Sequence, residues 1–396
     1  MIEAKSLFKD KVVLVTGHTG FKASWLCLWL WQLGAKVIGF SRKENPPKNG
    51  LYLRANLADK IQEKSGNISK YEDVLDAITE HQPDFVFHLA AQAFVPVAKR
   101  QPYDTINVNA MGTLNVLEAI RNTECVKGAL FITTDKVYYN KEMEWGYREN
   151  EELGGAGDPY AASKAAADIF IECYRKTFFD IKDETGLLQP PYIATARAGN
   201  VIGGGDWGEG RLVKNFVERC ILKKIPLELT DLKSTRPWQH VIDCLGGYLL
   251  IGTKLMQLVS DLNADPLNLE ELTEKTNIYP HSWNIGPLID ANVNLVDFTN
   301  LMIKYAGKGS YIHLKALKLK EAKLLYVDNT LAIKKLGWYP ILSLEDGVRL
   351  TIEWYKEVLD HPDEDITEYS LEQIREFQAI ASKNGKTWLF DNCLAI

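Results

Sequence analysis

Short apolar runs rich in β-branched residues alternate with longer segments of helical periodicity through the first half of the chain. The apolar runs are residues 11–16, 36–40, 84–91 and 129–132, and helical periodicity marks 24–33 and 107–120. Brief apolar runs between helical segments are typical of parallel strands that are buried on both faces. The pattern therefore predicts an α/β fold with a Rossmann-like, doubly wound parallel sheet.

The second half of the chain is less regular. Residues 261–278 are rich in Asp, Glu, Asn and Thr, which is typical of a surface insertion. Helices are predicted over residues 213–222, 327–338, 344–357 and 370–382. The last of these lies in a tail that begins with an acidic run, and its pattern fits packing on this chain or on a partner subunit equally well.

The composition is that of a globular enzyme, because 46% of the 396 residues are hydrophobic and 25% are charged. The formal net charge of -6 argues against nucleic acid as a partner, since binding phosphates requires a basic surface. The cysteines form no C-x-x-C pair and the histidines lack the spacing of metal ligands, so no metal site is predicted. No signal-peptide pattern is present, and the apolar segment 24–33 is too short to span a bilayer. A cytoplasmic protein without a membrane partner is expected.

A glycine turn joins the first predicted strand to the first predicted helix. Gly17 permits a tight turn, Gly20 lets the backbone approach a pyrophosphate, and Ala23 allows close packing of helix on strand. The helix N-terminus and the small residues that end strand 84–91 would also face a dinucleotide. The residues predicted to contact it here are Gly17, His18, Thr19, Gly20, Phe21, Lys22, Leu89, Ala90 and Ala91.

The residues after the second strand bear on which dinucleotide is bound. An acidic residue at this point would favour NAD by bonding the ribose, but the chain has Ser41, Arg42 and Lys43. On this motif alone, a cation can meet the 2′-phosphate of NADP. The alternative is a solvated basic loop, so the local pattern leaves NAD and NADP both open.

Three polar residues follow the predicted strand 129–132, where ligands bind in open α/β sheets. Thr134, Asp135 and Lys136 bring a hydroxyl, a carboxylic acid and an amine to that place. Tyr160 and Lys164 lie four residues apart, which puts both on one face of a helix. An ammonium close to the phenol would let Tyr160 act as a base nearer neutral pH. The alternative is an ordinary exposed helix start, and the upstream dinucleotide site favours the catalytic interpretation.

Several segments resemble, in order, those of the extended short-chain dehydrogenases/reductases and, within them, the CDP-glucose 4,6-dehydratases. They are residues 16–22, 134–138, 145–149, 158–164, 197–207, 235–241 and 283–287. The pair at 135–136 favours this group, because the dTDP-glucose enzymes carry Asp-Glu there. The resemblance implies a Rossmann domain over 1–195 with returning segments near 235–255 and 282–290, a sugar-nucleotide domain over 196–360, and an extension over 361–396.

The resemblance also implies a reaction, in which CDP-glucose loses water to give a 4-keto-6-deoxy sugar through an internal hydride cycle. Tyr160, helped by Lys164, would take the proton of the C4 hydroxyl, and Thr134 would bond the C4 oxygen. Asp135 would protonate the departing C6 hydroxyl. Lys136 stands where related enzymes have a carboxylate base, and both a base and an enolate-stabilising cation stay open as its role. NAD is preferred to NADP because a closed cycle must start oxidised and the cellular NAD pool is mostly oxidised.

The remaining expected site residues also follow from the resemblance. Asn67 and Ile68 would meet the adenine, although the family usually has an aspartate at position 67. The residues expected to bind the sugar nucleotide are Gln92, Asn200, Arg211, Arg236 and Trp238. For each arginine the alternative is a surface ion pair, and for the tryptophan it is a place in the core. Residues 94–99 lack the Arg, Ser and Tyr usual in the family, which leaves the sugar open.

Two other functions compete with the dehydratase. An epimerase or reductase on the same fold would share Thr134, Tyr160 and Lys164 without needing the Asp135-Lys136 pair. A non-catalytic protein that only senses a dinucleotide would not need Tyr160 or Lys164, and both are present. A dehydratase for another nucleotide sugar is a further alternative. The resemblance implies a homodimer or homotetramer.

Overall fold

The computed structural model describes residues 7–43, 46–155, 157–184, 186–232, 234–264, 269–314 and 324–386. Its centre is a seven-stranded sheet in which all neighbouring strands are parallel, in the order β10-β6-β5-β4-β1-β2-β3. The strands are β1 (Val12–Thr16), β2 (Lys36–Ser41), β3 (Gln62–Ser65), β4 (Phe85–His88), β5 (Gly128–Ile132), β6 (Tyr192–Arg197) and β10 (Ser282–Asn284). The order reverses between β1 and β4, which is where such sheets bind ligands.

Alternate residues of the inner strands face two different hydrophobic cores. Leu14 belongs to the core that includes α4 (Tyr71–His81), α7 (Gly112–Arg121) and α8 (Pro159–Tyr174). Val13 and Val15 belong to the other core, which includes α2 (Phe21–Gln32) and α10 (Val241–Asn263). Helices therefore cover both faces, as the continuous apolar strands predict. The helix α10 is long and apolar enough to cross a membrane, but it is largely buried in the core.

Two predicted helices differ in detail from the observed ones. The helix α2 begins at Phe21, directly after the N-cap Gly20, which is three residues earlier than predicted. The predicted helix 107–120 is a π-helical turn Asn107–Met111 followed by α7, and the short helix α6 (Pro102–Ile106) directly precedes it. The turn aims the buried Asn109 side chain at Ser163 and at the backbone of Gln92. Such turns are frequent at functional sites.

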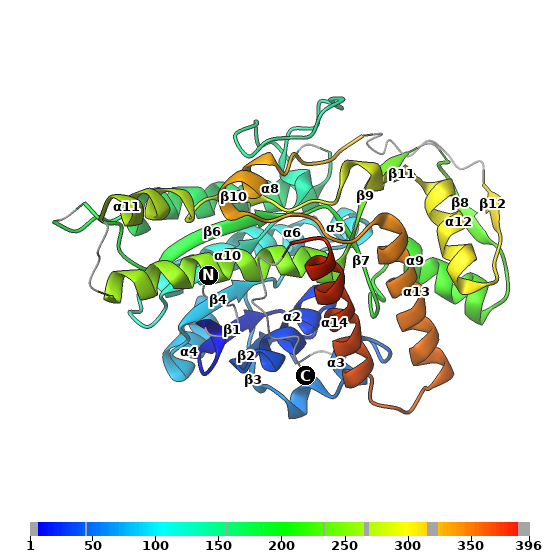
Figure 1. Ribbon diagram of the computed structural model, residues 1–396, viewed down its shortest axis with the longest axis horizontal. Coiled ribbons are helices and arrows are strands. Elements are labelled where there is room, and N and C mark those ends of the chain that lie inside the picture. Colours follow the sequence, from blue (N-terminus) through cyan, green and yellow to red (C-terminus); the bar gives the residue numbers. More distant parts are fainter. Residues whose placement is uncertain are drawn as a thin grey trace.

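A smaller lobe is built from the second half of the chain and lies beside the sheet (Figure 1). It contains β7 (Asn200–Ile202), β9 (Thr235–His240) and β11 (Asn292–Asn294) in one sheet, and β8 (Leu227–Leu229) paired with β12 (Tyr311–His313) in another. Its helices are α9 (Leu212–Phe216), continued by the π-helical turn Val217–Leu222, α12 (Leu295–Ala306) and α13 (Leu344–Asp360). The segments α10 and β10 leave this lobe and return to the large sheet.

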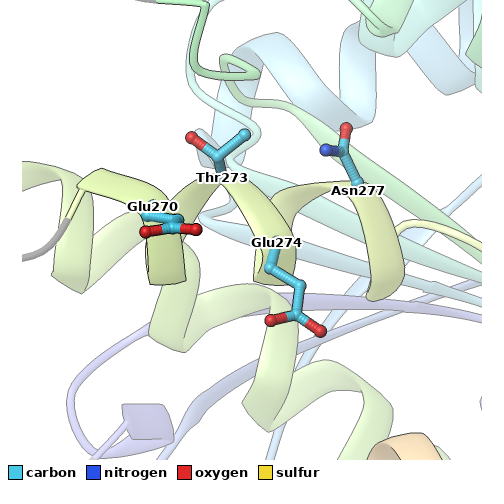
Figure 2. Close-up of a pocket in the computed structure, with 4 residues that line it drawn as sticks. All are labelled: Glu270, Thr273, Glu274 and Asn277. Carbon is cyan, nitrogen blue, oxygen red and sulfur yellow. The ribbon is translucent and has the colours of Figure 1, made fainter.

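The polar segment 261–278 is only partly a surface insertion. The helix α10 continues to Asn263, and α11 (Leu269–Ile278) buries Leu272 and Thr276 while its other side is open to solvent. The exposed side forms a shallow hollow lined by Glu270, Thr273, Glu274 and Asn277 (Figure 2). None of these residues belongs to the candidate site described below.

The tail packs on its own chain. The helix α14 (Thr367–Lys383) lies beside α2 and α13 (Figure 1), and Phe377 meets the ring of Trp29 edge-on at 5.9 Å. The indole of Trp354 donates to Ser370 Oγ at 3.0 Å. Arg54 donates to the carbonyls of residues 361, 362 and 364, just before α14. Residues 387–396 of the predicted extension lie outside the described residues.

Candidate active site

The glycine turn between β1 and α2 lies at the point where the strand order reverses. It forms a cradle that is lined by backbone rather than by long side chains. Gly17 has φ +75°, and a Cβ there would come within 2.9 Å of Ala90 Cα, so only glycine fits. Thr16 Oγ1 accepts from the backbone N–H groups of Leu89 and Ala90 at 3.1 and 3.0 Å, which fixes the end of β4 against β1. Gly20 is the N-cap of α2 and has no side chain that could bond the first N–H groups of the helix. These N–H groups therefore face the cradle. These features fit the pyrophosphate of a dinucleotide.

His18 lies in the glycine turn, and its side chain is buried against β3. Its side chain is 2% exposed, and Nε2 lies 2.7 Å from Glu63 Oε1 on β3. The ring lies over Gly39, where a Cβ would come within 2.5 Å of it. Burial lowers the pKa of His18, although Glu63 opposes the shift. The His18 side chain thus contacts Glu63, and its predicted contact with the dinucleotide stays a prediction.

Lys22 reaches from the first turn of α2 towards the predicted catalytic residues. Its Nζ lies 3.4 Å from the hydroxyl of Tyr248 on α10. Its positive charge opposes the rise that burial causes in the pKa of Asp135 and adds to the lowering that burial causes in the pKa of Lys164. Lys22 thus links the cradle to the site of chemistry, whereas the pattern indicated only a place beside the pyrophosphate.

The outer part of the predicted dinucleotide site has few free polar groups. The side-chain oxygen of Asn67 accepts from the N–H of Ser69 at 3.0 Å, and Ile68 is buried against Gly112. Ser41 ends β2, and Arg42 is exposed beyond it. Thr19 is half-buried in the glycine turn, and the half-buried Phe21 packs near Gly203.

The end of β5 delivers Thr134 and Asp135 into a buried place. The Thr134 hydroxyl lies 2.9 Å from Asp135 Oδ1, and both residues are less than 7% exposed. A Cβ on Gly199 would come within 2.7 Å of Asp135 Oδ2, so a glycine makes room for the carboxyl. Burial raises the pKa of Asp135, and the charge of Lys136 opposes this shift. Asp135 is thus suited to hold a proton.

Tyr160 and Lys164 lie on α8, which Asp158 caps and Pro159 begins. The Lys164 ammonium donates to the carbonyl of Ile132 at 2.9 Å, and burial lowers its pKa to about 8. Burial raises the pKa of Tyr160 to about 12, while a hydrogen bond with Thr134 and the charge of Arg211 oppose that rise. The expected lowering of the phenol pKa by Lys164 is therefore corrected, because the ammonium is directed at a backbone carbonyl.

Two predicted substrate residues have other tasks. The amide of Gln92 accepts from the N–H of Phe94 and donates to the carbonyl of Phe94 and to Thr105 Oγ1. Trp238 is 9% exposed and stacks on Phe298 of α12, with ring centroids 3.9 Å apart. Gln92 thus braces its own loop and Trp238 packs in the core, and their predicted substrate contacts stay predictions.

The other predicted substrate residues remain half-buried near the site. Asn200 begins β7 directly after Gly199, the residue that borders Asp135. Arg236 lies on the neighbouring strand β9. Arg211 Nε is 3.1 Å from Asp206 Oδ2, and its guanidinium carbon lies 5.5 Å from the Phe94 ring centroid.

A buried polar network below the site has no counterpart in the predictions. Arg197 on β6 makes two hydrogen bonds to Asp168 on α8, at 2.6 and 3.0 Å. Asp168 also accepts from Thr133 at 2.8 Å, and Arg197 also donates to the hydroxyl of Tyr138 at 3.0 Å. Arg197 and Tyr138 lie in segments that resemble the family, but nothing indicated that they meet, because the partners lie far apart in the sequence.

Other kinds of site are not apparent in the part of the chain that the structure describes. No group of three or more His, Cys, Asp or Glu side chains there is placed to hold a metal ion. The five cysteines within it are free thiols.

The strand order, the glycine cradle and the placing of Thr134, Tyr160 and Lys164 define the class of the extended short-chain dehydrogenases/reductases. Within this class, the chain belongs to the GDP-mannose 4,6 dehydratase family, whose model matches residues 14–351. The family makes it an enzyme of nucleotide-sugar metabolism, and it confirms the predicted fold class and the predicted resemblance.

The chain is 34% identical to CDP-glucose 4,6-dehydratase of Salmonella typhimurium over 89% of this chain and 92% of the relative. It is 23% identical to CDP-paratose 2-epimerase of Salmonella typhi over 86% and 98%. Among solved structures, UDP-glucose 4-epimerase of Thermotoga maritima with UDP-glucose matches with a TM-score of 0.70 and 23% identity, over 88% and 99%. The dTDP-glucose 4,6-dehydratase of Bacillus anthracis with NAD matches with a TM-score of 0.65 and 20% identity, over 88% and 97%.

Proposed function

We propose that this chain converts CDP-glucose to CDP-4-keto-6-deoxyglucose, with NAD as cofactor. The observation that carries the proposal is the buried carboxyl of Asp135, whose pKa is raised beside Thr134 and Tyr160. Elimination of water needs an acid for the departing hydroxyl, whereas epimerisation or reduction at C4 does not. The 34% identity to the Salmonella CDP-glucose 4,6-dehydratase supports the choice of substrate.

The cradle between β1 and α2 would hold the dinucleotide. Gly17 and Gly20 leave room for a pyrophosphate, and the start of α2 turns its N–H groups to it. NAD, when bound, supplies the acceptor for hydride from C4 and the donor that returns hydride to C6. Lys22 stands between this cradle and Asp135, so its charge acts on both.

Tyr160 is the proposed base for the C4 hydroxyl. With a pKa near 12 the phenol holds its proton at neutral pH, so it needs further positive charge to act as a base. Lys136, whose Nζ lies 6.0 Å from the ring centroid of Tyr160, is a cation beside it. Thr134 shares a hydrogen bond with the phenol and would bond the C4 oxygen as it becomes a carbonyl.

The C4 carbonyl acidifies the C5 proton, and elimination across C5 and C6 follows. Asp135, protonated, gives its proton to the departing C6 hydroxyl. Lys136 either removes the C5 proton or stabilises the enolate. Solvent-deuterium exchange at C5 separates these roles, because Lys136→Met abolishes exchange if the lysine is the base and only slows it if the lysine stabilises charge.

The proposed function is tested by incubating the protein with NAD and CDP-, dTDP-, GDP- or UDP-hexoses, with mass spectrometry to detect loss of water. We expect loss from CDP-glucose first, and a product that absorbs in alkali as a 4-keto-6-deoxy sugar does. Tyr160→Phe should abolish turnover and leave cofactor binding nearly intact. Epimerised CDP-glucose without loss of water would replace the dehydratase by an epimerase.

We also propose a cytoplasmic homodimer, with a homotetramer as the alternative. Large apolar side chains are exposed on α6, on α8 and on the turns beside them: Tyr103, Ile106, Met111, Ile169 and Phe178. A patch of this kind on packed helices favours a subunit interface. Sedimentation of wild type and of Ile169→Glu tests this, because a monomeric wild type would contradict it.

A further inference from the structure

A carboxylate stands on β3, the strand that pairs with β2, whereas β2 itself ends in Ser41 and is followed by Arg42. Glu63 on β3 is the register partner of Gly39 on β2. Its Oε1 lies 2.6 Å from the hydroxyl of Tyr52 and 2.7 Å from Nε2 of His18. Tyr52 belongs to the short helix α3 (Leu51–Arg54), which follows β2 in sequence. Three separate segments therefore fix one carboxylate.

The carboxylate reaches the level of the glycine cradle. His18 follows Gly17 beyond the end of β1, and its ring fills the space that a side chain at Gly39 would need. Because His18 contacts Glu63, the carboxylate lies next to the turn that faces the dinucleotide. The Glu63 side chain is 37% exposed, so the group is open to solvent and to a ligand.

The two donors do not cancel the negative charge of Glu63. Burial lowers the pKa of His18, which favours the neutral ring beside the carboxylate. Tyr52 donates as a neutral phenol, and burial raises its pKa. The next residue of β3, Lys64, is paired with Glu80 on α4.

We propose that Glu63 makes this site select NAD over NADP, by repelling the 2′-phosphate and offsetting the charge of Arg42. The proposal rests on the proposed use of a dinucleotide and names the residue that sets its specificity. In this fold an acidic residue at the end of β2 usually favours NAD, and here a residue of β3 would do so instead. Arg42, which taken alone indicates NADP, directly follows β2, the strand that pairs with β3.

Calorimetric titration of stripped protein with NAD and with NADP tests the proposal without any nucleotide sugar. Glu63→Gln should lower the Kd for NADP about tenfold, as expected when one repulsive charge is removed at partly solvated range. The Kd for NAD should change less than about threefold. Glu80→Gln removes the same charge from the far side of β3, so both its Kd values should match wild type.

An unchanged ratio of the two Kd values in folded Glu63→Gln would overturn the proposal, as would a wild type that binds NADP more tightly than NAD. If Glu63→Gln does not fold, a salt series on wild type decides. If repulsion dominates, screening by salt should lower the Kd for NADP relative to the Kd for NAD. A ratio of the two Kd values that moves the other way would reject the proposal. A chain that binds NAD selectively but leaves CDP-glucose unchanged would refute only the proposed function.

Discussion

Two arginine–carboxylate pairs near the candidate site have the same chemistry and opposite surroundings. Arg197 and Asp168 lie under the proposed catalytic residues, with side chains 3% and 0% exposed. Arg100 and Glu209 join α5 (Val95–Arg100) to the loop 206–211, with side chains 58% and 52% exposed. Both pairs have two-point geometry, with contacts between 2.6 and 3.0 Å.

The difference shows what each pair does for the site. The buried pair is completed by Thr133 and Tyr138, so removing one member leaves a charge without water or a partner. It therefore fixes β5, β6 and α8 against one another beneath Thr134 and Tyr160. The exposed pair gains little over solvation, so it tethers the loop that carries Arg211 without holding it rigidly.

The strongest way to break the buried pair is Asp168→Asn. This change leaves the buried Arg197 guanidinium without its opposite charge, so it should lower the free energy of unfolding by about 3–5 kcal/mol. Urea unfolding of wild type and variant measures this. The double change Asp168→Leu with Arg197→Met should cost less than the single one, and a single variant within about 1 kcal/mol of wild type would contradict the assigned role.

Asp135→Asn tests the proposed chemistry separately from the stability of the protein. Asparagine keeps the shape and can still bond Thr134, but it has no acidic proton for the C6 hydroxyl. Turnover should fall by about a hundredfold or more while thermal stability stays near wild type. Product formation, together with accumulation of reduced cofactor seen by absorbance, checks the prediction. Product release at the original rate would remove Asp135 from the mechanism.

The pH dependence of the free energy of unfolding tests the lowered pKa of the buried Lys164. The pKa of Lys164 is about 8 in the folded chain against an ordinary 10.5. Between these values the unfolded state binds more protons, so this residue's contribution to stability rises with pH. Below pH 8 both states are protonated and the contribution is flat. The unfolding free energy of wild type relative to Lys164→Met should therefore rise between pH 8 and 10.5, and a falling difference would contradict the shift.

The smallest effect is expected for the exposed pair. Glu209→Gln should change the free energy of unfolding by less than about 0.5 kcal/mol. Because the loop loses one tether, the KM for the nucleotide sugar should rise about two- to threefold. Glu172→Gln, which breaks the exposed pair with Lys176 on α8, is the matched control and should leave KM unchanged. Equal changes in KM in both variants would show that the Arg100–Glu209 pair does not position the loop 206–211 for the substrate.

The sheet was predictable because parallel strands buried on both faces appear as short apolar runs. The strands β1 and β4 lie inside the runs that predict them, and β2 and β5 each extend one residue beyond theirs. The start of α2 was less predictable, because residues 21–23 are also compatible with a longer glycine loop. The family and the fold class are confirmed, whereas the roles of the individual site residues stay predictions.

Contacts between distant segments are what the sequence could not supply. Nothing near Glu63 or Asp168 indicates that His18 and Arg197 will meet them, because each partner comes from another strand or helix. The direction of a side chain was equally hidden. Gln92 could have faced the ligand or the loop, and the N–H of Phe94 sets the outcome. For Trp238, the ring of Phe298 does the same.

The packing of α14 on α2 sets an order for biosynthesis. The helix α2 emerges early from the ribosome, yet Trp29 is covered by Phe377, which is made some 350 residues later. Until then this apolar surface has no partner on the nascent chain, although domains ordinarily fold from the N-terminus as they appear. A chain that stops at Ile366 would leave Trp29 and Trp354 uncovered, so premature termination near the end would yield an aggregation-prone protein whose catalytic residues are all present.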